Sequence, residues 1–243
     1  TLNKEEKELV IKTVVEANKG RLPLVLGIGG NNTLAVVEEL KTGDLSEFDA
    51  VLSVSPYYNK PTQEGIYQHY MAVQEVCPLP IILYNVPGRT GSNMSADTIL
   101  RLARDSEKFI AVKEASGNMA QVMQILKHKP DHFNVISGDD ALTVPLMACG
   151  AVGAISVIAN ALPDTFSQMV DFANNRLFHE ANALSNKMLD IHDWLYVEGN
   201  PVGVKGAMEL LGLCSRDVRL PLVPLSKNAL DNLALELKKS DFL

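Results

Sequence analysis

Short apolar segments rich in β-branched residues recur along the chain at regular spacing. They cover residues 22–29, 49–56, 79–87, 109–116, 133–140 and 151–160. Strands that are covered on both faces of a parallel sheet have this uninterrupted apolar character, whereas half-exposed strands alternate apolar and polar residues. The pattern therefore predicts six parallel strands.

Segments with helical periodicity separate these strands. They cover residues 31–40, 63–76, 95–105, 117–128 and 139–149, and one further helix precedes the first strand. Ser95 is a candidate N-cap, with Asp97 in the first turn after it. Alternation of strand and helix predicts βα units and a parallel sheet with right-handed crossovers. From about residue 161 the strands stop, and the remaining segments all have helical patterns.

Composition and charge narrow the class of partner. The chain has 243 residues, a size at which one α/β barrel domain is common. Its net charge of −7 argues against nucleic acid as a partner. No apolar run reaches the roughly 18–20 residues that span a bilayer, so we expect no membrane partner. Three cysteines without a CxxC spacing indicate a reducing cytoplasm and no disulfide framework or zinc site.

Functional residues of α/β folds gather at the carboxyl ends of the strands. The first such end, GIGGNN at residues 27–32, has Asn32 where the dinucleotide-binding GxGxxG pattern needs its third glycine. We interpret it as a tight turn in which the glycines permit positive φ angles.

Lys113 lies inside an otherwise apolar strand segment, FIAVKEAS. Burial disfavours an ammonium group and lowers its pKa, which turns a lysine into an amine nucleophile for carbonyl carbons. The alternatives are a strand-end lysine that reaches solvent, or one that pairs with Glu114. The spacing alone leaves nucleophile and alternatives evenly balanced.

Two further strand ends carry polar groups. In YNVPGRTG, Tyr84 ends a strand and could move protons near an amine, while Arg89 follows a turn and could bind a carboxylate by two hydrogen bonds. In SPYYNKP, Tyr57 and Tyr58 lie in a loop. The alternatives are a surface salt bridge for Arg89, a half-buried aromatic ring for Tyr84, and loop or interface packing for the tyrosine pair.

The motifs PYYNKP, YNVPGRTG, VKEASGN and SGDD, in this order, resemble the dihydrodipicolinate synthase family of lysine-dependent (class I) pyruvate aldolases. The resemblance covers the whole chain. It implies a (β/α)8 TIM barrel with a C-terminal helical extension, in which residues 1–175 form a partial barrel and residues 176–243 the extension of the same domain. It also implies that the family's first two strands and its threonine loop are missing from this chain, which would explain why six strands are visible.

The resemblance further implies the chemistry of the site. Lys113 would form a Schiff base with pyruvate, Tyr84 would move protons beside it, and Tyr58 would act as a proton relay in the neighbouring subunit's site. Arg89 would bind the carboxylate of the aldehyde, aspartate semialdehyde. Gly138 and Ile155 would line the pyruvate pocket.

The same resemblance implies the product and the assembly. The product would be 4-hydroxy-tetrahydrodipicolinate, in lysine and diaminopimelate biosynthesis. No cofactor or metal would be needed, and the protein would be a cytoplasmic homodimer or homotetramer.

Two alternative functions stay open. One is a sister aldolase that acts on N-acetylneuraminate or on a 2-keto-3-deoxy sugar acid, which Arg89 argues against. The other is a non-catalytic homologue, which the missing threonine loop favours and the joint presence of Lys113, Tyr84, Tyr58 and Arg89 disfavours. We also expect that the chain without the two strands aggregates or is inactive, because a barrel lacking them has open apolar edges.

Overall fold

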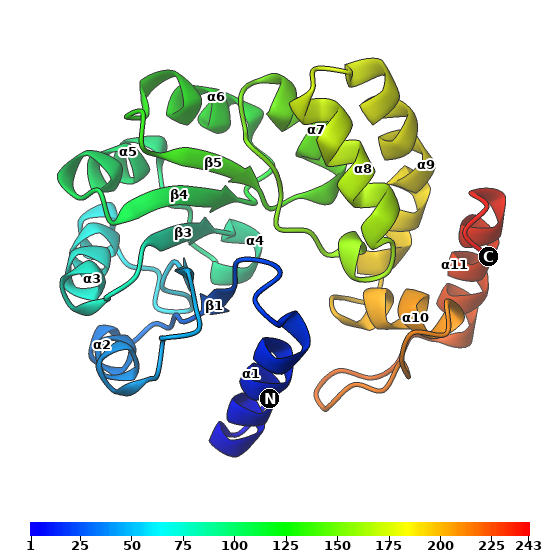
Figure 1. Ribbon diagram of the computed structural model, residues 1–243, viewed down its shortest axis with the longest axis horizontal. Helices are drawn as coiled ribbons and strands as arrows, with labels where there is room; N and C mark the ends of the chain where they lie inside the picture. The colour runs from blue at the N-terminus through cyan, green and yellow to red at the C-terminus, as the bar shows by residue number, and fades with distance from the viewer. The chain divides into compact units, whose positions relative to one another are not determined.

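A five-stranded sheet with the order β1-β2-β3-β4-β5 organises the first half of the computed structural model, which describes residues 1–243 (Figure 1). Strands β1 to β4 pair in parallel. The strands are β1 (Val25–Gly27), β2 (Ala50–Val54), β3 (Ile81–Asn85), β4 (Phe109–Glu114) and β5 (Asn134–Ser137). The predicted α/β fold with a parallel sheet is therefore confirmed.

Helices connect the strands, as the βα pattern predicts. They are α1 (Lys4–Asn18), α2 (Thr33–Thr42), α3 (Gln63–Val76), α4 (Pro87–Thr90), α5 (Ala96–Asp105) and α6 (Met119–His128). Helices α2, α3, α5 and α6 lie side by side along the outer face of the sheet (Figure 1). The hydroxyl of Ser95 caps α5 by accepting a hydrogen bond from the backbone N–H of Thr98, so the predicted N-cap is confirmed.

The two faces of the sheet differ in chemistry. Val51, Leu83 and Val112 are fully buried, on the face toward the helices. On the opposite face, Ala50, Ile82 and Ala111 form a small apolar cluster. Successive residues of a strand point to opposite faces, so the direction of each side chain at a strand end follows from this alternation.

Residues 137–243 are predominantly helical. They contain the 3₁₀ helices η1 (Asp140–Leu142) and η2 (Ile158–Asn160), and the helices α7 (Thr143–Ala148), α8 (Pro163–Asn174), α9 (Phe178–Tyr196), α10 (Val202–Leu210) and α11 (Lys227–Lys239). Helix α9 packs against α8, α10 and α11.

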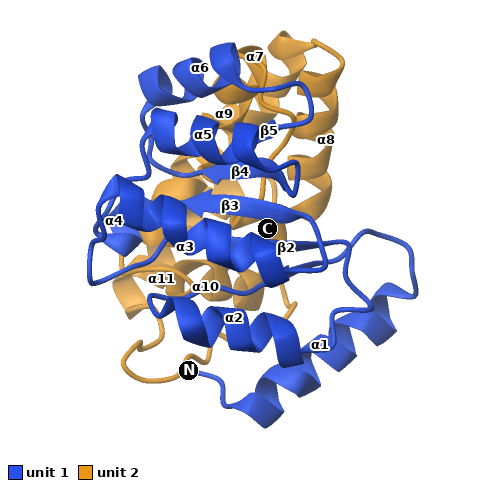
Figure 2. Ribbon diagram, turned by 90° about the vertical axis from the view of Figure 1, so that its left-hand side faces the viewer, with its two compact units in different colours: residues 1–136 blue, residues 137–243 orange.

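The chain divides into two compact units, residues 1–136 and residues 137–243 (Figure 2). The predicted division is of another kind, because it separates the barrel, residues 1–175, from a helical extension, residues 176–243, within one domain. That division stays a prediction.

The predicted sixth strand, residues 151–160, is present only as one parallel bridge between Ser137 and Ala154. The carboxylate of Asp140 accepts hydrogen bonds from the backbone N–H groups of Val157 and Ile158. These bonds turn the chain into η2 instead of letting the strand continue.

The GIGGNN turn also differs from its prediction. None of Gly27, Gly29 and Gly30 has a positive φ. At Gly29 a Cβ would lie 2.9 Å from both the backbone nitrogen and Cγ1 of Val54. Glycine is needed there because the loop passes close to β2, and not because of its backbone angle.

Candidate active site

Tyr84 and Lys113 are direct neighbours at the carboxyl ends of β3 and β4. Because paired residues of adjacent strands point to the same face, both side chains lie on the side of the sheet opposite the helices. The Lys113 Nζ lies 4.2 Å from the centroid of the Tyr84 ring. Both residues are partly buried. The structure therefore brings together the predicted nucleophile and the predicted proton-transfer residue.

The Tyr84 hydroxyl is held in its protonated form. Burial raises the pKa of Tyr84, and the positive charge of Arg89 partly opposes that shift. At neutral pH the group is therefore a phenol that can donate a proton and receive it back. The electrostatic effect of Arg89 also indicates that its guanidinium acts at the same edge of the sheet as Tyr84.

Arg89 is an exposed residue of the short helix α4, which starts at Pro87. Proline is favoured at the first position of a helix, where its missing N–H has no partner to lose. The helix ends at Gly91, which has φ of 72°. An exposed guanidinium on a short, sharply bounded helix is suited to binding a carboxylate that arrives from solvent.

The loop that carries Tyr58 is anchored near Arg89. The backbone N–H of Tyr58 donates to the carbonyl of Thr90, at 3.2 Å. Tyr58 has φ of 71°, which is unusual for a bulky residue, and its side chain is 87% exposed. Its ring therefore packs against almost nothing in this chain.

A network of buried polar side chains lies on the opposite face of the same strand ends. Glu114, next to Lys113, is 2% exposed and accepts hydrogen bonds from Asn85, Ser116 and Gln121. Sequence reasoning considered Glu114 only as a partner of Lys113. Strand alternation instead directs the two side chains to opposite faces.

The signal that could have located this network is present in the sequence. Both strands end in a pair of polar residues, Tyr84-Asn85 and Lys113-Glu114. In a strand covered on both faces, such a pair places one polar group on each face.

Gly138 and Ile155 lie in the unit of residues 137–243, next to the Ser137–Ala154 bridge. The backbone N–H of Ile155 donates to the carbonyl of Ser137 at 2.9 Å, so the chain segments that carry Gly138 and Ile155 run side by side. Asp140 fixes the residues that follow Ile155, because its Oδ2 lies 3.0 Å from the Val157 nitrogen and 2.8 Å from the Ile158 nitrogen.

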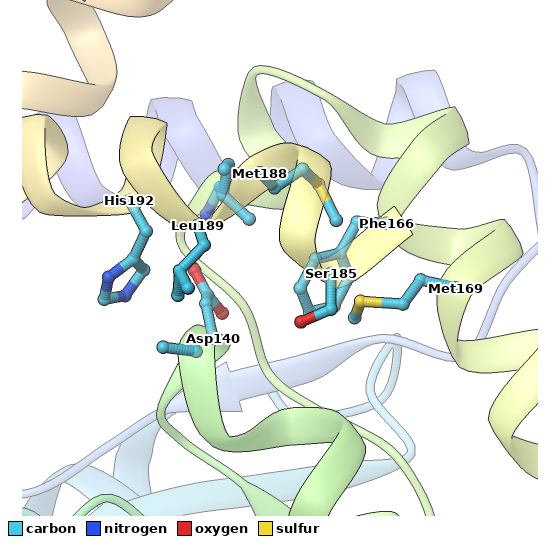
Figure 3. Close-up of a pocket in the computed structure, with 9 residues that line it drawn as sticks. Asp140, Phe166, Met169, Ser185, Met188, Leu189 and His192 are labelled. Carbon is cyan, nitrogen blue, oxygen red and sulfur yellow. Dashed lines mark hydrogen bonds between the residues drawn. The ribbon is translucent and has the colours of Figure 1, made fainter. Parts of the chain in front are cut away.

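A small cavity lies behind Asp140, between η1, α8 and α9 (Figure 3). Its lining includes the apolar side chains of Phe166, Met169 and Met188, and Ser185 and His192 add polar groups (Figure 3). Its volume is about 10 Å³, which corresponds to about one water molecule. It is a packing gap in the helical unit and too small for an organic substrate.

The structure contains neither a metal-binding cluster nor a membrane-spanning helix. No group of three or more His, Cys, Asp or Glu side chains is placed to hold a metal ion. No helix is both long and apolar enough to cross a bilayer.

The chain resembles one family over almost its full length. The sequence profile of the dihydrodipicolinate synthetase family matches residues 1–240. A 4-hydroxy-tetrahydrodipicolinate synthase from Flavobacterium psychrophilum is 55% identical over 239 residues, which are 98% of this chain and 82% of the relative. The enzyme of the same name from Parabacteroides distasonis is 54% identical over 224 residues, 92% of this chain and 75% of the relative.

Solved structures give the same result. The dihydrodipicolinate synthase from Thermotoga maritima superposes with a TM-score of 0.96 at 35% identity, over 100% of this chain and 83% of that chain. The chloride-inhibited enzyme from Acinetobacter baumannii, solved in complex with pyruvate, superposes with a TM-score of 0.95 at 40% identity, over 100% of this chain and 83% of that chain.

Proposed function

The chain belongs to the dihydrodipicolinate synthetase family, and from this premise we propose how its residues divide the work of the reaction. The enzyme condenses pyruvate with L-aspartate 4-semialdehyde to 4-hydroxy-tetrahydrodipicolinate, a step of lysine and diaminopimelate biosynthesis. Relatives at 46–55% identity that carry this name favour the synthase over a sister aldolase or a non-catalytic homologue.

Lys113 starts the reaction. Its amine adds to the C2 carbonyl of pyruvate, and the carbinolamine loses water to give an iminium ion. The iminium draws electrons from the neighbouring methyl group, which loses a proton to become an enamine. The observation that supports this proposal is the distance of 4.2 Å between the Lys113 Nζ and the centroid of the Tyr84 ring, because a proton-transfer residue must lie near the amine that it serves.

Carbon–carbon bond formation follows. The enamine carbon attacks the aldehyde carbon, and the resulting alkoxide takes up a proton. The amino group of the semialdehyde then attacks C2, which releases Lys113 and closes the ring. Tyr84 delivers and receives the protons at the amine, and Tyr58 relays them from a neighbouring subunit.

The remaining groups bind the substrates. Arg89 binds the carboxylate of the semialdehyde, and the backbone around Gly138 and Ile155 lines the pyruvate pocket. The 87% exposure of Tyr58 supports a role across a subunit contact, so we propose a homodimer or homotetramer. A cytoplasmic location completes the proposal.

Borohydride trapping with pyruvate tests the assignment of Lys113. Reduction converts the imine into a stable secondary amine, which peptide mass mapping locates. We expect the pyruvate adduct on the peptide that contains Lys113, and no adduct in the Lys113→Arg variant. An adduct on another lysine, with none on Lys113, would refute the role of Lys113.

A further inference from the structure

The buried network behind the two catalytic strand ends contains one carboxylate that faces only donors. Glu114 accepts from the Asn85 Nδ2 at 3.1 Å, from the Ser116 backbone N–H at 2.7 Å and from the Gln121 Nε2 at 3.1 Å. An ionised carboxylate has acceptors only, so it matches these three donors. A neutral amide in its place would turn an NH₂ group toward another donor.

Asn85 extends the network along the edge of the sheet. Its Nδ2 also donates to the Asn93 Oδ1 at 2.9 Å, and its Oδ1 accepts from the Met94 backbone N–H at 2.9 Å. Its backbone carbonyl accepts from the Ala115 N–H at 2.9 Å. Asn85 thus joins β3 to the loop that follows α4 and to the first residue after β4.

Helix α6 closes the network on its outer side. The amide of Gln121 donates to Glu114 and receives a hydrogen bond from the Asn93 Nδ2 at 2.8 Å. Asn93 and Met94 come only a few residues after Arg89, so the same bonds reach the segment that carries the proposed carboxylate-binding residue.

The ends of β3 and β4 and the loop that follows α4 are therefore tied to one buried carboxylate. Glu114 follows Lys113, Asn85 follows Tyr84, and the Asn93 loop follows Arg89. A buried carboxylate is costly unless it is fully hydrogen-bonded, and apolar side chains would join two strands without that cost. Hydrogen bonds to the carboxylate have preferred distances and angles, which apolar contacts lack, so each bond fixes the position of its donor.

We infer that Glu114 is a positioning residue for the imine-forming step. Its ionised carboxylate, through Asn85 and Gln121, holds the ends of β3 and β4 in the register that places the Lys113 amine over the Tyr84 ring. This inference rests on the proposed function of Lys113 and Tyr84.

The test compares Glu114→Gln with the wild-type chain and with Glu64→Gln. Glu64 is an exposed carboxylate of α3 that bonds Gln68 and Arg101, so its substitution is the matched control for loss of a hydrogen-bonded carboxylate. The rate of borohydride-trapped imine formation is measured with saturating pyruvate, per mole of folded protein. Steady-state kcat and KM for both substrates accompany it.

We expect Glu114→Gln to slow imine formation and kcat by about 100-fold, because misplacing a reacting group by about 1 Å has an effect of this size. The KM for the aldehyde should change much less, since Arg89, the residue proposed to bind it, makes none of the hydrogen bonds of the network. Glu114→Asp, which keeps the charge, should recover part of the rate. Glu64→Gln should trap pyruvate at the wild-type rate.

If Glu114→Gln does not fold, Gln121→Met replaces it, because this variant removes one donor and leaves the carboxylate in place. A loss of about 10-fold in the trapping rate is expected, similar to the loss of an outer-shell partner at other sites. A wild-type trapping rate in the folded variant, even with lower thermal stability, would overturn the inference and leave the proposed function intact. A wild-type chain that forms its pyruvate adduct on another lysine and not on Lys113 would overturn both.

Discussion

Mild acid should destabilise the chain through a single buried histidine. His69, on α3, is 4% exposed. Its Nδ1 lies 2.9 Å from the Thr33 hydroxyl, and its Nε2 is buried without a hydrogen-bond partner. Burial lowers the pKa of His69 to about 4, from an ordinary value of 6.5. The neutral ring is therefore the form that the folded chain accepts.

The sign of the effect follows from the two states. The unfolded chain, in which His69 has a pKa near 6.5, binds the proton more readily than the folded chain. The stability that neutral His69 contributes is therefore complete above about pH 6.5 and is lost as the pH falls toward 4. Between pH 7 and pH 5 the loss in the free energy of unfolding is about 2 kcal/mol.

The carboxyl groups with shifted pKa values do not mask the effect of His69 between pH 7 and pH 5. Hydrogen bonds lower the pKa values of three carboxyl groups below their ordinary values, which are 3.8 for Asp44 and 4.5 for Glu64 and Glu198. They bind protons mainly below pH 4.5, in the folded and the unfolded chain alike. Their contribution therefore appears at lower pH than that of His69.

Urea unfolding at pH 7, 6 and 5 measures the loss. The variant His69→Gln cannot titrate and should lose much less stability across this range than the wild-type chain. The control His128→Gln removes an exposed histidine and should follow the wild-type dependence. If the free energy of unfolding fell equally with pH in the wild-type chain and in His69→Gln, the argument that burial holds this ring neutral would be refuted.

Three further predictions concern the site and its support. Tyr84→Phe removes the proton-transfer hydroxyl and should lower kcat by about 100- to 10 000-fold; a stopped assay of the condensation measures it, and an unchanged kcat would exclude the role. Arg89→Ala should raise the KM for aspartate semialdehyde by about tenfold or more and leave the rate of imine trapping with pyruvate unchanged. A trapping rate that falls as much as the KM rises would contradict the proposed role of Arg89. Asp140→Ala should lower the free energy of unfolding by about 1–3 kcal/mol, because it removes the oxygen that accepts from the backbone N–H groups of both Val157 and Ile158; urea denaturation tests this.

The sequence predicted best those elements whose signals are local. Helix α3 has the predicted bounds of residues 63–76, and the hydroxyl of Ser95 caps α5 as expected. The signals that predict such a helix are its capping residue, the spacing of its apolar residues and the turn at its end. Each of these signals lies within a few residues of the helix itself. No long-range contact is needed to read them.

The two failures have long-range causes. The strand expected at residues 151–160 is interrupted because Asp140, from another segment, binds the N–H groups of Val157 and Ile158. Gly29 is required by the approach of Val54, which lies 25 residues further along the chain. Neither contact leaves a trace in local composition, so periodicity could not have predicted them.

The candidate site shows the same contrast in finer detail. Lys113 could be found from the sequence because a cation is conspicuous in an apolar strand. Its nearness to Tyr84 required the register of β3 against β4, which periodicity does not give. Glu114 was noticed for its charge as one possible partner of Lys113, whereas its hydrogen bond with Asn85, which lies 29 residues away, depends on the same register.

Strand alternation supplies the rule that would locate this network from the sequence. A strand that is buried on both faces has no place for two successive polar residues unless each face holds a polar structure. When Tyr84-Asn85 and Lys113-Glu114 end adjacent strands in register, two polar structures must exist, one on each side of the sheet. The groups able to do chemistry, an amine and a phenol, occupy one side. The groups that hydrogen-bond one another, a carboxylate and amides, occupy the other side. A nucleophilic amine needs an environment that does not stabilise its ammonium form, whereas a buried carboxylate needs hydrogen-bond donors that stabilise its charge. Adjacent residues on opposite faces meet both requirements, and this explains why an acidic residue directly beside the nucleophile does not have to pair with it.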